Sequence, residues 1–149
     1  MRLRSILLSV FALAFIANLN GQNRITVTLE EFTVLSVSGR ADVEIVPSGS
    51  HDMSITSRNG QPEDVEYEIK NGKLKIKTKV DLKKGNEISI KVPYNQLTSI
   101  EAAGGAVINS RNDLKSDDLN LRALTGGKIE ISIEAGMVDA KTTQGSDII

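Results

Sequence analysis

Apolar and polar residues alternate along most of the chain after residue 22, with the period of two that is typical of β-strands with one buried face. The alternation is clearest in seven segments: RITVTL, FTVLSV, ADVEIV, DMSIT, DVEYEIK, KLKIKTK and EISIKV. None of them shows the apolar spacing of about 3.6 residues that an amphipathic helix needs. The pattern predicts an all-β domain.

Residues 64–79 are predicted to form an antiparallel hairpin. Apolar and polar positions alternate on both sides of the dipeptide Asn71-Gly72. Asn-Gly is the strongest two-residue signal for a tight hairpin, because both turn positions need a positive φ. In this hairpin we expect Tyr67 on the buried face.

The chain after Leu97 repeats a short motif in which small residues precede an apolar step. The copies are AAGGAVI at 102–108, ALTGGKI at 123–129 and TTQGSDII at 142–149. Their spacing of about 20 residues is within the range of solenoid repeats, and glycine permits sharp corners and close backbone approach. The repeats predict a β-solenoid; the alternative is an antiparallel sandwich in which the Gly-Gly pairs are hairpin turns.

The three repeats are aligned on Ala102, Ala123 and Ala140. This alignment predicts an inward apolar column across the repeats, and an outward charged column in which a cation lies between two anions. The inward column is Val107, Ile129 and Ile148, and the outward column is Glu101, Arg122 and Asp139. The spacing from the alanine to the next glycine anchor increases along the chain, which predicts a corner that lengthens from repeat to repeat.

The N-terminus has the order of a secretory signal peptide. Arg2 and Arg4 precede the apolar run ILLSVFALAFIA, which is followed by the polar stretch NLNG. The run is shorter than the roughly 20 apolar residues of a membrane span. The alternative is a buried first strand or helix. We place cleavage after Gly21, which leaves a signal peptide at 1–21 and a single all-β domain at 22–149.

The composition limits the partners and the compartment. Lysine and arginine total 18 against 19 for aspartate and glutamate, so the chain lacks the basic excess that nucleic-acid binding requires. There is no cysteine for a disulfide, a thiolate metal site or a lipid anchor. We therefore expect an exported bacterial protein in the periplasm, on the outer surface or outside the cell.

Two longer segments, LSVSGRADVEIVPSGS and NEISIKVPYNQLTSIEAAGGAVI, together with the glycine-containing repeats, resemble the putative auto-transporter adhesin head domain, or GIN domain. The resemblance extends from Phe32 to the last residue. It implies an all-β fold dominated by a right-handed parallel β-helix. Together with the hairpin predicted from Asn71-Gly72, this gives a parallel β-helix or solenoid with antiparallel hairpins in the N-terminal half of the chain. It also implies a location outside the cytoplasm, and it identifies no catalytic residue.

Candidate chemistry is sparse. His51 lies in the segment SGSHD, but a nucleophilic triad needs members from distant segments, so a solvated turn is the better interpretation. The carboxylates of NDLKSDD at 112–118 lack the ligand spacing and the glycine of a calcium loop, so an exposed corner is favoured. We predict no catalytic, cofactor-binding or metal-binding residue.

Sugar binding is the obvious adhesin function, yet the domain has few aromatic rings. Phe32 and Tyr67 are expected to be buried, so Tyr94 is the ring expected at the surface; its alternative role is to cover the end of the core. The candidate ligand-facing residues are Tyr94, Glu101, Arg122 and Asp139.

Three classes of function remain. We favour a non-enzymatic exported adhesion or binding module that presents its strand faces to a cell-surface glycan or an envelope protein. The alternatives are a carbohydrate-active β-helix enzyme, and a structural or envelope-stress component that binds other envelope proteins. The last repeat ends in Ile148-Ile149 without a polar cap. We therefore expect a domain that is shortened at its C-terminus and whose last repeat either pairs edge to edge with a second copy or makes the protein poorly soluble.

Overall fold

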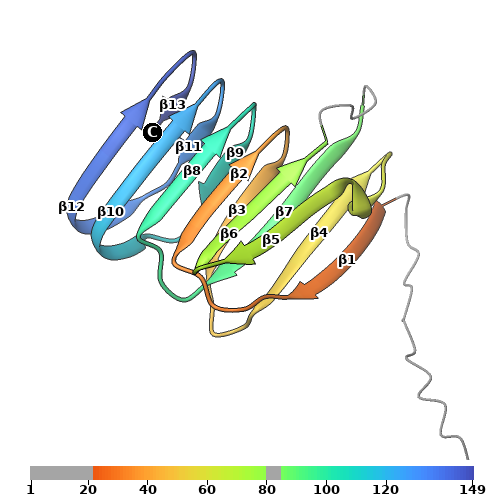
Figure 1. Cartoon of the computed structure of the whole chain (residues 1–149), viewed down its shortest axis with the longest axis horizontal. Coiled ribbons are helices and arrows are strands. Elements are labelled where there is room, and N and C mark those ends of the chain that lie inside the picture. The colour runs from red at the N-terminus through yellow and green to blue at the C-terminus, as the bar shows by residue number, and fades with distance from the viewer. Residues whose placement is uncertain (1–21, 80–84) are drawn as a thin grey trace, which may run out of the picture.

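Residues 22–79 and 85–149 are described by the computed structural model of the chain, and the predicted signal peptide at 1–21 lies outside them. These residues form two mixed β-sheets that face each other (Figure 1). The helical part of the described residues is a single 3-10 turn, η1 (Pro62–Asp64). The predicted all-β class is confirmed.

The first sheet, sheet A, has seven strands and the second, sheet B, has six. In spatial order, sheet A consists of β1 (Gln22–Thr28), β4 (Asp52–Arg58), β7 (Glu87–Tyr94), β3 (Asp42–Pro47), β9 (Val107–Ser110), β11 (Lys128–Glu130) and β13 (Asp147–Ile148). Sheet B consists of β12 (Ile133–Thr142), β10 (Leu114–Leu124), β8 (Ser99–Ala103), β2 (Val34–Ser38), β6 (Lys73–Thr78) and β5 (Val65–Lys70).

Antiparallel pairing is confined to one end of the two sheets. Strand β4 pairs antiparallel with both β1 and β7, and β5 pairs antiparallel with β6. The β5–β6 hairpin turns at Asn71 and Gly72, whose φ angles are 52° and 72°. The predicted hairpin at 64–79 is therefore confirmed, together with the positive φ angles that its Asn-Gly turn requires.

The other neighbouring strands are parallel, and successive strands cross from one sheet to the other. Thus β2, β8, β10 and β12 lie in sheet B, and each is followed in the chain by its partner in sheet A. The stacking order differs from the chain order at one place. The pair β2–β3 lies between β6–β7 and β8–β9 (Figure 1). The N-terminal half is therefore not a simple succession of repeats.

The repeated small residues form a turn of the same conformation in each of the three repeats. In the turn Ala103–Ala106, the N–H of Ala106 donates to the carbonyl of Ala103 at 3.2 Å, and both central glycines have positive φ. The equivalent central residues are Thr125 and Gly126, with φ of 47° and 74°, and Gln144 and Gly145, with φ of 50° and 68°. Positive φ at both central positions is the property of a type I′ turn and explains the recurring glycines.

The predicted alignment is correct for the first two repeats at their alanines and wrong for the third. Ala102 pairs with Ala123 as predicted, but Ala123 then pairs with Thr142, and Ala140 pairs with Leu121. The third repeat is thus displaced by two residues. The reason is that the turn sets the register, whereas the prediction was anchored on an alanine.

The inward apolar column begins at Ile108 and not at Val107. Ile108 pairs with Ile129, which pairs with Ile148, whereas Val107 pairs with Lys128 on the outer face. The predicted lengthening of this corner is also wrong, because partners differ by 21 in number both before and after the first turn. Spare residues lie at the opposite corner, where 111–113 connect β9 to β10 and only 131–132 connect β11 to β12.

The space between the sheets is filled by aliphatic side chains. The largest fully buried ones include Leu35, Ile45, Ile55, Ile76, Ile100, Ile108 and Leu121. Phe32 is also buried, as expected. Tyr67 is paired with the buried Ile76, yet it is 43% exposed, so its predicted burial is wrong. The reason is its position on β5, one of the two edge strands of sheet B.

Replacing Gly127 with alanine should destabilise the domain strongly. A Cβ atom at Gly127 would lie 2.1 Å from the carbonyl oxygen of Ala102, a backbone atom that cannot rotate away. We expect a loss of about 1–3 kcal/mol or more in the free energy of unfolding, measured by urea titration. Gly49→Ala is the matched control, because no atom lies within 4 Å of its added Cβ. Equal unfolding midpoints for the two variants would contradict the described packing of this corner.

Candidate binding surface

The outer face of sheet A carries two neighbouring rows of polar side chains. In the first row the register aligns Arg24, Thr56, Ser89 and Asp42 on β1, β4, β7 and β3. In the second row it aligns Thr26, Ser54, Lys91, Glu44 and Asn109, and so reaches β9. Because side chains alternate between the two faces of a strand, all of these point away from the core.

The two rows enclose a depression that we call the sheet A hollow. Its floor is formed by the short side chains of Ser54, Thr56 and Ser89. Its walls are formed by three cations, two carboxylates and one amide: Arg24, Lys91, Arg111, Asp42, Glu44 and Asn109. The hollow exists because small hydroxyl residues on β4 and β7 lie between longer residues on both sides.

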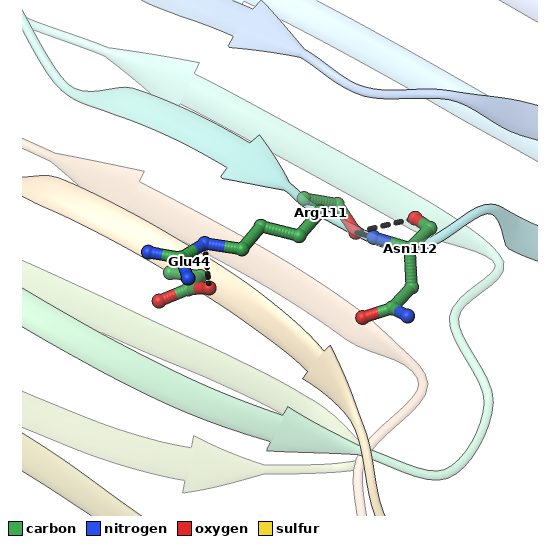
Figure 2. A network of polar contacts seen from close by, with 4 residues as sticks. Glu44, Arg111 and Asn112 are labelled. Atoms are coloured by element: carbon green, nitrogen blue, oxygen red, sulfur yellow. Dashed lines mark hydrogen bonds and ion pairs between the residues drawn. The ribbon is translucent and has the colours of Figure 1, made fainter.

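Arg111 closes one side of the hollow through an ion pair. Figure 2 shows its side chain extending from the end of β9 to Glu44 on β3, with Nε 3.0 Å from Oε1. The turn that carries Arg111 is held locally, because the Ser110 hydroxyl donates to the Asn112 carbonyl at 2.6 Å and accepts from the Asn112 N–H at 3.3 Å. Glu44 is 26% exposed, so its carboxylate remains accessible.

Several polar groups of the hollow are free to bind a ligand. Among residues 22–79 and 85–149, neither Arg24 nor Lys91 has a carboxylate oxygen within 4.0 Å. Within the same ranges, the hydroxyls of Ser54, Thr56 and Ser89 make no side-chain hydrogen bond. The hollow therefore presents cationic donors and uncommitted hydroxyls side by side.

The predicted charged column lies on the opposite face of the molecule, on sheet B. Glu101 and Arg122 are register partners on β8 and β10, and Glu101 accepts a hydrogen bond from the Ser36 hydroxyl at 3.0 Å. Asp139 is opposite Asn120, and Lys141 is opposite Arg122. The predicted cation between two anions is therefore wrong, because the third repeat is displaced by two residues.

Tyr94 is buried, so the expectation of an exposed ring is wrong. The side chain is 5% exposed and lines a small pocket with Phe32, His51 and Pro93, where three connecting segments meet. This environment fits the alternative role of covering the end of the core. Burial raises the pKa of the Tyr94 hydroxyl above its ordinary value, because the phenolate loses hydration there.

The structure does not bring the four predicted residues together, and sequence reasoning missed the sheet A hollow. Most residues that line the hollow occupy the polar positions of the alternating segments. Their grouping depends on the spatial order β1-β4-β7-β3-β9, in which no two neighbours are consecutive in the chain. Apolar periodicity indicates which residues share a face of a sheet, but it does not determine the spatial order of the strands.

In the described part of the chain, no three His, Cys, Asp or Glu side chains are grouped so that they would hold a metal ion. No helix among the described residues is long and apolar enough to cross a membrane. The interpretation of His51 as part of a solvated turn agrees with its exposure.

The fold and the surface define an all-β domain with polar outer strand faces. The chain belongs to the family described as putative auto-transporter adhesin, head GIN domain, whose model matches residues 31–149. The resemblance inferred from the sequence is thereby confirmed. None of the curated proteins matches the chain.

Solved structures with a similar fold include proteins from two Parabacteroides species. A putative adhesin from Parabacteroides merdae has a TM-score of 0.75 at 19% identity, and one from Parabacteroides distasonis has 0.73 at 14%. Each match covers 85% of this chain and 55% of the other, so this chain spans about half the length of those proteins. A putative lipid binding protein from Parabacteroides distasonis has a TM-score of 0.64 at 15% identity, covering 86% of this chain and 60% of its own.

Tyr94→Phe should reduce the loss of stability at high pH. The raised pKa means that the folded state holds the phenolic proton more tightly than the unfolded state. This contribution to stability is present below the ordinary pKa near 10 and is lost as the pH rises through the folded value. Urea unfolding between about pH 8 and 11 measures it. Tyr67→Phe, on an exposed ring, is the control; an identical decline in wild type and Tyr94→Phe would contradict the described burial.

Proposed function

We propose that this chain is a non-enzymatic exported adhesion or binding module that presents its outer strand faces to a cell-surface or envelope partner. The observation that carries the proposal is the sheet A hollow, where Arg24 and Lys91 have no ion-pair partner, and three hydroxyls no side-chain hydrogen bond, among residues 22–79 and 85–149. A rigid sheet that places free donors and acceptors in a fixed pattern is suited to recognition.

The family supports export and adhesion by its description, which names an auto-transporter adhesin. The predicted signal peptide at 1–21 supports the same direction, with the periplasm, the outer surface and the extracellular space as the compartments to be distinguished. The lipid-binding description of one structural neighbour adds a second kind of partner to test, since the shared fold does not determine the ligand.

Binding is favoured over glycoside cleavage by the state of the two carboxylates in the hollow. A cleaving enzyme needs one carboxyl group kept protonated as a general acid, usually by burial away from cations. Asp42 is exposed, and Glu44 forms an ion pair with Arg111. Neither carboxyl group has the environment of a general acid.

We further propose that the strand pairs β8–β9, β10–β11 and β12–β13 form a parallel β-helix. The proposal is supported by parallel pairing in both sheets and by the recurring turn with two positive φ angles. In such an arrangement each rung adds an equivalent outer row, so polar positions line up over a long face.

Ser89→Tyr should weaken adhesion to bacterial or host cell surfaces. Ser89 is exposed on the floor of the hollow, so a ring there fills the depression without entering the core. Ser132→Tyr, in the exposed connection between β11 and β12, is the matched control. Flow cytometry of labelled domain on cells should show a several-fold loss for Ser89→Tyr alone. Equal binding by both variants would contradict the assignment of this surface.

A second copy of the chain is a further candidate partner, suggested by the edge strand β12. Three of the exposed large apolar residues lie in this region: Met137 (67%), Val138 (44%) and Ile149 (71%). Within the described residues, β12 pairs only with β10. Antiparallel pairing of two β12 strands centred on Ala140 would place Asp139 opposite Lys141 of the other copy twice, which is favourable.

Charge reversal tests this pairing. Asp139→Lys would place like charges opposite each other and should convert a dimer to a monomer in light scattering, whereas the double variant Asp139→Lys, Lys141→Asp should restore the dimer. Ile149→Lys should also weaken the dimer, since it puts a charge at an exposed apolar edge position. A monomeric wild-type domain at all concentrations would overturn the proposal.

A further inference from the structure

We propose that the sheet A hollow binds an acidic glycan, a chain of sugars that carry carboxylate groups. The inference rests on the proposed binding function and names the ligand class of that surface. It follows from the charge, the free hydroxyls, the length and the lack of an aromatic platform at the hollow.

The charge of the hollow favours an anionic ligand. Three cations and two carboxylates line it, and one carboxylate, Glu44, is already paired with Arg111. Arg24 and Lys91 have no carboxylate partner within 4.0 Å in the described ranges. Guanidinium groups bind carboxylates through two parallel hydrogen bonds, so Arg24 is suited to hold a uronate carboxylate.

The floor of the hollow favours a ligand that also carries hydroxyl groups. Ser54 is 8% exposed. Its hydroxyl is not among the fully buried unpaired hydroxyls of the described residues, which are those of Ser57 and Thr78, so it reaches the surface and can contact a ligand group that enters the hollow. Thr56 and Ser89 extend the same strip, and Asp42 adds an acceptor for sugar hydroxyls.

The length of the hollow favours a chain and not a single ion. Its lining residues come from five neighbouring strands, β1, β4, β7, β3 and β9. Neighbouring strands lie about 4.8 Å apart, so β1 and β9, the strands at the two ends of the hollow, are separated by roughly 19 Å of sheet. One sulfate or phosphate group would contact only part of this length, whereas linked sugars would extend across it.

Recognition through charge also agrees with the positions of the aromatic rings. Phe32 and Tyr94 are buried, and the exposed Tyr67 lies at the edge of sheet B. Among the described residues the hollow therefore has no ring on which a neutral sugar would stack. Ion pairs and hydrogen bonds must supply the affinity, and it should fall as salt is added.

The test uses polygalacturonate as the acidic probe and dextran as the neutral one, with isothermal titration calorimetry of the domain. Polygalacturonate should bind and dextran should not. The variant Arg24→Gln, Lys91→Gln should bind at least about tenfold more weakly, because it loses charge-assisted hydrogen bonds. Arg122→Gln is the matched control, since it removes an exposed arginine from the outer face of sheet B. Circular dichroism and thermal unfolding verify that each variant is folded.

Four results would overturn the inference: no binding of polygalacturonate, equal binding of dextran, full affinity in the double variant, or equal weakening by Arg122→Gln. Phosphatidylglycerol vesicles form a further arm, and binding to them in preference to polygalacturonate would assign the anion to a lipid headgroup and also overturn it. If Ser89→Tyr still abolishes cell adhesion while polygalacturonate does not bind, the proposed function survives and only this ligand class fails.

Discussion

The parallel alignment of backbone turns is the constraint on which the rest of the structure depends. At the recurring corner, the N–H of Gly104 donates to the carbonyl of Thr125, and the N–H of Gly126 donates to that of Gln144, both at 3.1 Å. These bonds require each turn to repeat the conformation of its neighbour, which explains why residues other than glycine, Thr125 and Gln144, also adopt positive φ. Once the turns coincide, the inward column from Ile108 to Ile148 and the outward rows of both sheets follow.

Much of this architecture could be predicted from the sequence. The alternating segments identified strands, Asn71-Gly72 identified a hairpin, and the small residues identified a recurring corner, because each of these signals is local. The predicted register of the third repeat is wrong because Ala140 was aligned with Ala102 and Ala123. The turn that contains Gly145 determines the pairing, and it places Thr142 opposite Ala123. The exposure of Tyr67 was missed because position at a sheet edge is not a local property.

The binding surface could not be predicted from apolar periodicity for a related reason. Ser54 and Ser89 are unremarkable polar positions in their own strands, and they become the floor of a hollow only because β4 and β7 are neighbours. Arg111 reaches Glu44 because β9 lies beside β3, although β3 ends at Pro47 and β9 begins only at Val107. The sequence therefore shows which polar side chains are present, and the spatial order of the strands determines which of them form a site.

The insertion of β2–β3 between later strands has a consequence for how the chain folds. Strand β2 pairs with β6 on one side and with β8 on the other, so the register partners of Val34 are Lys73 and Ser99. Both contacts span long loops, whose closure costs entropy before any pairing compensates for it, and folding dominated by such contacts is slow. The strands β2 and β3 therefore have unpaired edges until β6–β7 and β8–β9 pair with them. For this reason we expect the two halves of the domain to fold as a single cooperative unit.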